Sequence, residues 1–155
     1  EITAEKGGCS VLLFRSVLEP APTKEEERAL QEFGYMIQLS DDIFDVWFDL
    51  QNGVETLATQ CCKNGDLGEL KRLFESQVGL AKAAIRSIRA TKGQSGTSLG
   101  ILHVLTAITR SCLEHYERLQ NVYHKLPTKR REYMVMDMEK WGNRLRVARA
   151  LFLQK

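Results

Sequence analysis

The stretch that decides the fold is Phe33-Gly34-Tyr35-Met36-Ile37-Gln38-Leu39-Ser40-Asp41-Asp42-Ile43-Phe44-Asp45-Val46-Trp47-Phe48-Asp49-Leu50. Placed on a helical wheel, at about 100° per residue, its polar side chains other than Ser40 fall into one narrow arc. The arc holds Gly34, Gln38, Asp41, Asp42, Asp45 and Asp49. The rest of the circle is apolar or aromatic, so the pattern predicts a mostly buried helix that carries one acidic stripe.

The four aspartates of this stripe have no counter-charge nearby in the sequence, because no Lys or Arg occurs between Arg28 and Lys63. Like charges one helical turn apart repel each other, and burial of unpaired carboxylates is costly. We therefore expect the stripe to face a wet cavity and to be compensated by cations. The alternative is an acidic helix face that forms ion pairs with Arg or Lys side chains of other helices.

Carboxylate oxygens spaced in this way suit a hard divalent cation. Mg²⁺ keeps several waters and takes one or two carboxylates together with substrate phosphates. Asp41, Asp45 and Asp49, one turn apart, would line a row of such ions, and Asp42 lies beside them. Gln38, one turn earlier, would hydrogen-bond a ligand oxygen or a metal-bound water. An EF-hand calcium site fits poorly, because its loop glycine and terminal glutamate are missing.

Helical periodicity continues through the rest of the chain, and strand-like alternation is absent. Thr23 predicts a helix start, with Glu26 completing a capping box, and Asn52-Gly53 predicts a stop. The Gly7-Gly8 pair costs about 1 kcal/mol per residue inside a helix, which indicates a break or a close approach by another segment. The predicted helices are 3–18, 23–51, 54–62, 66–88, 98–124 and 129–153, with linkers at 19–22 and 91–96. An interruption of the last helix at Gly142 is left open. We predict an all-α bundle of about five or six helices in one domain, residues 1–155.

The 155 residues suffice for one domain with a core, and 43% hydrophobic with 27% charged residues is ordinary for a globular protein. No apolar run approaches the roughly 20 residues needed to span a bilayer. The net charge of +2, with acids and bases interleaved, gives no reason to expect binding of nucleic acid. The four cysteines lack metal-ligand spacing and are expected to be reduced thiols. Without a signal peptide, a cytoplasmic location is predicted.

The order Gln38-x-x-Asp41-Asp42-x-x-Asp45, followed by Asp49 and Gly53, resembles the second aspartate-rich motif of class I isoprenoid synthases, which include the trans-prenyl diphosphate synthases. The spacing of Asp41, Asp45 and Asp49 is also similar to the metal motifs of squalene and phytoene synthases and of terpene cyclases. Glu5-Lys6-Gly7-Gly8 resembles the lysine segment that precedes the motif in prenyl synthases. The resemblance ends near residue 60, and beyond it only the helical character matches.

The resemblance implies an isoprenoid synthase fold, Mg²⁺ as the cofactor and a prenyl diphosphate as the substrate. In that family, metal ions and lysine neutralise the departing pyrophosphate, and an allylic cation forms in an apolar cavity. The implied residues are Asp41, Asp42 and Asp45 for catalysis, the same three with Asp49 for the metal, and Lys6 and Gln38 for the substrate. Arg144, Arg146 and Arg149 are further candidates for phosphate contacts. A homodimer is left open.

Two departures limit the resemblance. The first aspartate-rich motif of the family is absent, since Asp66 and Asp137 are the only other aspartates and neither belongs to an Asp-x-x-Asp pattern. Gly53 is followed by Val54 and not by lysine. We therefore expect the C-terminal part of a longer synthase or a non-catalytic relative or subunit, with a plain helical interaction domain as a third hypothesis. Chain elongation, head-to-head condensation and cyclisation are all left open.

Overall fold

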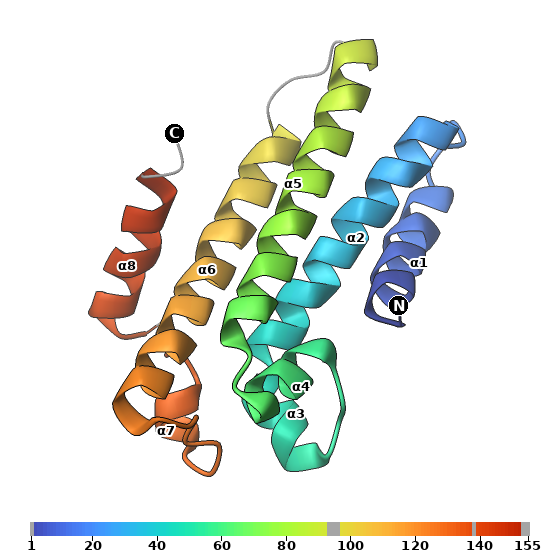
Figure 1. Ribbon diagram of the computed structural model, residues 1–155. Coiled ribbons are helices and arrows are strands. Elements are labelled where there is room, and N and C mark those ends of the chain that lie inside the picture. Colours follow the sequence, from blue (N-terminus) through green and yellow to red (C-terminus); the bar gives the residue numbers. More distant parts are fainter. Residues whose placement is uncertain (1, 93–96, 138, 153–155) are drawn as a thin grey trace. The chain divides into compact units, whose positions relative to one another are not determined.

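The computed structural model describes residues 2–92, 97–137 and 139–152, and within these ranges every regular element is an α-helix (Figure 1). The helices are α1 (Ile2–Ser16), α2 (Lys24–Phe44), α3 (Val46–Asn52), α4 (Leu57–Asn64), α5 (Leu67–Lys92), α6 (Thr97–Tyr123), α7 (Arg131–Met134) and α8 (Trp141–Phe152). The prediction of an all-α protein is confirmed, whereas the isoprenoid synthase fold stays a prediction. No helix in these ranges has the length and the apolar composition needed to span a membrane.

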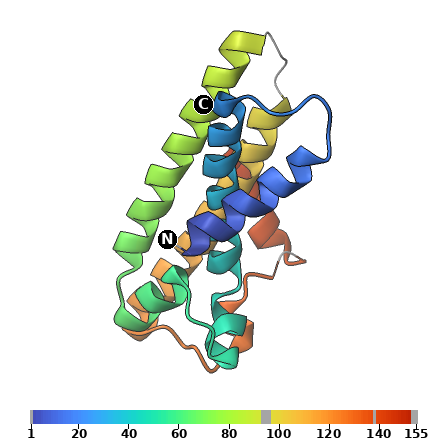
Figure 2. The ribbon, with the colours of Figure 1, turned by 90° about the vertical axis from the view of Figure 1, so that its right-hand side faces the viewer.

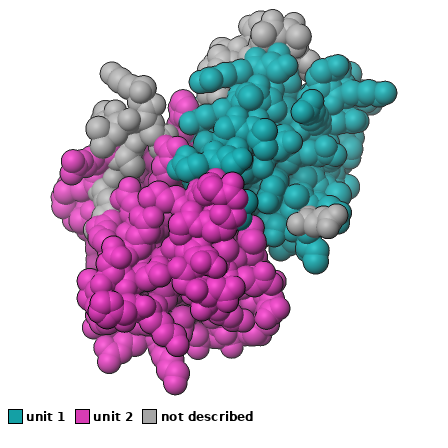
Figure 3. All heavy atoms as spheres, in the orientation of Figure 1, with its two compact units in different colours: residues 1–39, 73–102 teal, residues 40–72, 103–155 magenta. Residues whose placement is uncertain are grey.

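The chain forms two compact units, which Figure 3 draws in different colours. Unit 1 comprises residues 1–39 and 73–102, and unit 2 comprises residues 40–72 and 103–155. The division passes through the long helices α2, α5 and α6, so that each unit holds one part of each of them. The prediction of a single domain is not decided by this division and stays a prediction.

In unit 1, α1 crosses α2 at a contact between two glycines (Figure 2). Gly7 and Gly34 are both buried, and the backbone of each occupies the space where a Cβ of the other would stand. A Cβ on Gly7 would also lie 2.8 Å from the Cβ of Gln38. The sequence left a break or a close approach as explanations for the Gly7-Gly8 pair. The structure has the close approach, since α1 runs unbroken through both glycines.

Polar contacts join the helices of unit 1. Thr23 caps α2 as predicted, because its Oγ1 accepts a hydrogen bond from the N–H of Glu26 at 3.2 Å. The guanidinium of Arg15, at the end of α1, forms an ion pair with Glu26 at 2.8 Å. Farther along α2, Glu32 accepts from the Gln77 side chain of α5 through its backbone carbonyl at 2.9 Å and its carboxylate at 2.8 Å. These bonds fix α1 and α5 against α2 within the unit.

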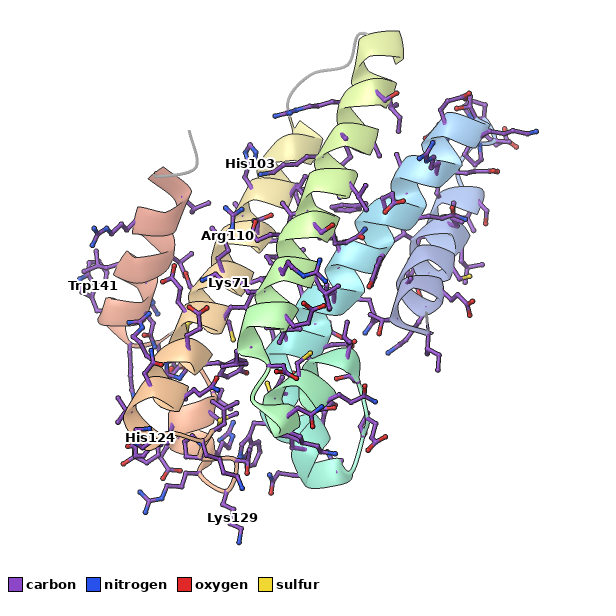
Figure 4. The ribbon with its side chains drawn as sticks, in the orientation of Figure 1. Lys71, His103, Arg110, His124, Lys129 and Trp141 are labelled. Carbon is purple, nitrogen blue, oxygen red and sulfur yellow. The ribbon has the colours of Figure 1, made fainter. Side chains whose placement is uncertain are left out.

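The core of unit 2 is built around Tyr116 of α6, which is almost completely buried. Its hydroxyl donates a 3.0 Å hydrogen bond to the backbone carbonyl of Ile43, in the last turn of α2. Burial raises the pKa of Tyr116 well above its ordinary value, so the hydroxyl keeps its proton and remains a donor. In the same unit Lys71 of α5, labelled in Figure 4, forms a 2.9 Å ion pair with Glu117 of α6.

Two glycines end the short helices of unit 2. Gly53 follows α3 with a φ of 68°, and Gly65 follows α4 with a φ of 80°. Each donates its backbone N–H to the carbonyl four residues earlier, on Asp49 and Cys61 respectively. Because this left-handed conformation carries a steric penalty for residues with a Cβ, glycine is favoured at both places. The predicted stop at Asn52-Gly53 is confirmed.

The prediction of one continuous helix over residues 23–51 is wrong, because the helix is interrupted. α2 and α3 are separated by Asp45, whose φ of −91° and ψ of 5° lie outside the helical range. Just before this break, the Ile43 carbonyl accepts its bond from Tyr116. An outside donor of this kind satisfies a backbone group at a helix kink. Because the donor comes from α6, no local sequence signal marks the break.

The helix predicted over residues 129–153 is interrupted, since the chain leaves helical geometry after α7 and resumes it at α8. The interruption left open at Gly142 is wrong in position, because Gly142 lies inside α8. Asp137 explains the gap. Its side chain accepts a 2.8 Å hydrogen bond from the N–H of Glu139, and its carbonyl accepts one of 2.6 Å from the Asn143 side chain. Such local bonds from aspartate offer the backbone an alternative to the helix.

The other helix boundaries differ from the prediction by a few residues. α4 begins at Leu57 and not at Val54, because Thr56 acts as its N-cap and forms a reciprocal capping box with Thr59. α5 continues through Thr91 and Lys92, where a linker was predicted. Residues 93–96 of that linker lie outside the described residues.

We predict that Gly7→Ala and Gly34→Ala each lower the free energy of unfolding by about 1–3 kcal/mol, the usual cost of overpacking. Each alanine gains about 1 kcal/mol of helix propensity, but its methyl group collides with the backbone of the facing helix, which has no flexible end that could move away. Denaturant unfolding monitored by circular dichroism measures the change.

The matched control is Gly79→Ala in α5, where a Cβ meets nothing within 4 Å. This variant is expected to gain about 0.5–1 kcal/mol from helix propensity alone. If Gly7→Ala and Gly34→Ala are as stable as Gly79→Ala, the close approach of α1 and α2 does not exist in solution.

Candidate functional site

The acidic stripe keeps its one-turn spacing across the break between α2 and α3. The N–H of Asp45 donates to the carbonyl of Asp41 at 2.9 Å, and the N–H of Asp49 donates to the carbonyl of Asp45 at 2.9 Å. Both are hydrogen bonds between residues four apart, as in an α-helix. The three aspartates therefore remain stacked on one side of the backbone, although the helix that carries them is not continuous.

The aspartates of the stripe differ in exposure. Asp41 and Asp45 are exposed, Asp49 is partly exposed, and Asp42 is buried with 7% of its surface accessible. Asp42 lay at the edge of the arc on the helical wheel, and the structure turns it inward. Of the four predicted metal ligands, Asp41 and Asp45 therefore offer the most open carboxylates.

The opposite side of the helix is buried as the sequence predicted. Met36, Leu39, Ile43 and Val46 have no exposed surface. One hollow of unit 2 has a volume of about 440 Å³ and is lined by Arg131, Glu132, Val135, Asp137 and Lys140, away from the acidic stripe in sequence. The wet cavity expected along the stripe stays a prediction.

The environment of the stripe changes the pKa of Asp45. Desolvation is the largest cause that raises the pKa of Asp45 above its ordinary value, and repulsion by Asp41 and Asp42 raises it further. The negative charges of neighbouring residues thus disfavour the ionised form. A cation placed at Asp41 and Asp45 would relieve this repulsion.

The two residues predicted to bind the substrate belong to unit 1. Lys6 is exposed on α1, and Gln38 is partly exposed on α2. The glycine contact brings their segments together, because Gly7, the neighbour of Lys6, lies directly against the Cβ of Gln38. In the sequence Gln38 precedes Asp41 by three residues, but Gln38 belongs to unit 1 and the aspartates belong to unit 2.

The carboxylates predicted as metal ligands can be compared with the coordination that Mg²⁺ prefers. Within the described ranges, no three or more His, Cys, Asp or Glu side chains are grouped closely enough to hold a metal ion. A metal cage made entirely by these residues is therefore not formed. Mg²⁺ bound through one or two carboxylates, with waters and phosphate oxygens completing its shell, does not need such a group. Asp41 and Asp45 fit this second mode.

Sequence reasoning missed the position of Arg131. Its guanidinium lies 5.9 Å from the ring centre of Trp47 and 5.6 Å from that of Phe48, so it stacks on the aromatic side chains of α3. Gln51 of α3 donates a 3.0 Å hydrogen bond to the carbonyl of Thr128, which joins α3 to the turn before α7. The sequence carried no signal for this contact, since about 80 residues separate its partners along the chain.

The cysteines take no part in the stripe. Cys61, Cys62 and Cys112 are buried and Cys9 is exposed, and all four are free thiols, as expected. Burial raises the pKa of Cys62 and of Cys112 to about 12. Thiols of this kind stay protonated and are poor nucleophiles and metal ligands.

No family model matches the chain, and no curated protein or solved structure matches it significantly either. The resemblance to isoprenoid synthases therefore rests on the motif residues of the sequence alone, and it stays a prediction.

We predict that Tyr116→Phe lowers the free energy of unfolding by about 1–2 kcal/mol, because a buried carbonyl next to the helix break loses its donor. Chemical denaturation measures the loss. The control is Tyr123→Phe, also on α6 but exposed, which should change stability by less than about 0.5 kcal/mol. Equal stability of the two variants would contradict a role for Tyr116 at the break.

We also predict that Asp45→Asn raises the melting temperature at pH 7 by about 1–3 °C, from a few tenths of a kcal/mol per repelling pair. Asp45 makes no side-chain cap bond that the amide would lose. Since its pKa is raised in the folded state, the ionised group lowers stability above that pKa. The penalty disappears as the pH falls through the folded pKa towards 3.8, the ordinary value.

The difference between Asp45→Asn and the unmodified chain should therefore shrink as the pH approaches 4. Thermal unfolding followed by circular dichroism across this pH range measures it. Glu55→Gln is the control, because Glu55 is exposed in the same unit and only forms a 3.5 Å surface ion pair with Lys63. A lower melting temperature of Asp45→Asn at pH 7 would show that the stripe is already compensated by cationic side chains.

Proposed function

We propose that this chain binds a prenyl diphosphate together with Mg²⁺ and that it takes part, within an isoprenoid synthase, in prenyl transfer or condensation. The observation that carries the proposal is the row formed by Asp41, Asp45 and Asp49. These residues are one helical turn apart, their backbone hydrogen bonds continue through the break, and the first two are exposed. This arrangement supports joint coordination of divalent cations by these carboxylates.

The proposed roles follow from the exposure of each side chain. Asp41 and Asp45 would bind Mg²⁺ directly, Asp49 would take a ligand or supporting position, and the buried Asp42 would orient its neighbours and strengthen the local negative field. When bound, Mg²⁺ supplies the positive charge that neutralises a diphosphate leaving group. The raised pKa of Asp45 supports this assignment, since the bound cation would stabilise the ionised carboxylates.

For Lys6 and Gln38 the proposed role is contact with the diphosphate or with metal-bound water. It rests on the resemblance of Glu5-Lys6-Gly7-Gly8 to the lysine segment of prenyl synthases. The close packing of Gly7 on Gln38 supports it, because this contact makes the position of the Lys6 segment depend on α2.

A second candidate function is a non-catalytic relative or subunit that binds the metal and diphosphate without turnover. The specific observation in its favour is that four of the six aspartates belong to one stripe, while Asp66 and Asp137 are isolated. Catalysis in the family uses two facing aspartate-rich helices. A chain with one such motif would hold half of the metal site.

The first experiment measures thermal stability with MgCl₂ alone, inorganic pyrophosphate alone, and both together. A ligand that binds only the folded state at 100 times its Kd stabilises by about 2.7 kcal/mol. We expect a clear rise in melting temperature only with both, because Mg²⁺ needs phosphate oxygens to complete its shell. The double variant Asp41→Asn/Asp45→Asn should lose this rise.

The matched control is Glu55→Gln/Glu114→Gln, which removes two exposed acids of the same unit that form only surface ion pairs. It should keep the full rise. The absence of a rise in the unmodified chain, or an equal rise in the aspartate variant, would contradict the proposal and favour a plain helical interaction domain.

The second experiment separates the two candidate functions. Release of pyrophosphate from geranyl or farnesyl diphosphate in the presence of Mg²⁺ would support catalysis by this chain. A thermal rise without any release would support the non-catalytic subunit.

A further inference from the structure

Helix α8 has two apolar faces that point in different directions. Val147 is buried in unit 2, whereas Trp141 is 69% exposed and Leu145 is 54% exposed. At 100° per residue, Trp141 and Leu145 lie within about 40° of each other, and Val147 is roughly opposite. In Figure 4 Trp141 lies on the side of α8 that faces away from α6. The outward face is therefore not needed for packing within the unit.

Positive charge borders this outward face on both sides. Arg144 and Arg149 are exposed, and on the helical wheel they flank the strip formed by Trp141 and Leu145 at about 60° and 80° from Trp141. The sequence of α8 contains three arginines and no aspartate or glutamate. Directly before the helix, the exposed Lys140 and the exposed Glu139 offset each other's charge, so the positive charge of this region comes from the arginines.

The combination of exposed tryptophan and leucine with flanking arginines is typical of helices that lie in a membrane interface. Tryptophan prefers the boundary between headgroups and acyl chains, and arginine can keep its charge at the phosphates while its stem covers apolar surface. A nucleic acid or a free phosphate would use the arginines but would leave Trp141 and Leu145 in water. Charge and apolar surface together favour a lipid partner.

We propose that α8 binds the surface of an anionic phospholipid bilayer. Trp141 and Leu145 insert among the headgroups, and Arg144 and Arg149 contact lipid phosphates. The 12 residues of α8 extend for only about 18 Å at 1.5 Å per residue, so the helix lies along the surface and does not cross the roughly 30 Å of hydrocarbon. Lys129 of the turn before α7, which projects from the ribbon in Figure 4, adds a further exposed cation in the same unit.

The test is co-sedimentation of the chain with vesicles of phosphatidylcholine that contain about 30% phosphatidylserine, compared with vesicles of phosphatidylcholine alone. We expect binding to the anionic vesicles, weak binding to the neutral ones, and a loss of binding at high salt. In a Trp47→Phe background, the emission of Trp141 should shift to shorter wavelength when anionic vesicles are added.

The double variant Trp141→Ser/Leu145→Ser should bind anionic vesicles at least tenfold more weakly. Arg149→Gln should weaken binding about fivefold, which corresponds to about 1 kcal/mol per cation near a charged surface. The matched control is Leu13→Ser, which removes a leucine of α1 that is 68% exposed and should leave binding unchanged. Circular dichroism checks that all variants keep their helices.

Two results would overturn the proposal. The first is equal binding of the Trp141→Ser/Leu145→Ser variant and the unmodified chain, which would indicate purely electrostatic attraction to any polyanion. The second is the same weak binding to anionic and neutral vesicles. Because the aspartate stripe does not insert, Asp41→Asn/Asp45→Asn should bind anionic vesicles at least as strongly as the unmodified chain, whether or not the proposed function is correct.

Discussion

The burial of one apolar ridge along α2 and α3 is the constraint on which the rest of the arrangement depends. The ridge consists of Met36, Leu39, Ile43 and Val46, all without exposed surface. Each buried side chain contributes about 1.5–3 kcal/mol, whereas each repelling pair of exposed aspartates costs a few tenths of a kcal/mol. Burial of the apolar ridge therefore decides which side of the helix faces the solvent. Asp41 and Asp45 are held in the exposed position, and their mutual repulsion is tolerated.

One contact between helices in each unit involves a residue of the proposed site or its neighbour. The contact of Gly7 with Gly34 lets α1 approach α2 so closely that the segment of Lys6 packs on Gln38. The hydrogen bond from Tyr116 to the Ile43 carbonyl lies just before Asp45, where the helix is interrupted. In both places a backbone group meets its partner across helices. Adding or removing a single atom at either contact is therefore expected to disturb the helix packing more than the same change in a contact between two side chains.

The same argument applies to the acidic stripe and to the outward face of α8. In both, the charge and polarity of the exposed side chains indicate the kind of ligand that would match them. A row of carboxylates without nearby positive residues in sequence suits a cation, and an apolar strip between arginines suits a surface that is both apolar and anionic. The proposed substrate, a prenyl diphosphate, is itself a lipid with a charged head. The proposed binding at a bilayer would bring the protein to the surface where a lipid of this kind is concentrated.

The sequence alone determined the features that depend on neighbouring residues. Apolar periodicity predicted the all-helical class and the buried side of α2, Thr23 predicted the start of that helix, and Gly53 predicted a stop. Only the tertiary structure decided the inward turn of Asp42, the break at Asp45 and the stacking of Arg131 on α3. The last two features involve partners far away in the sequence, such as Tyr116, which is 73 residues from Ile43. Local propensity carries no information about such partners, because they meet only after the helices have packed.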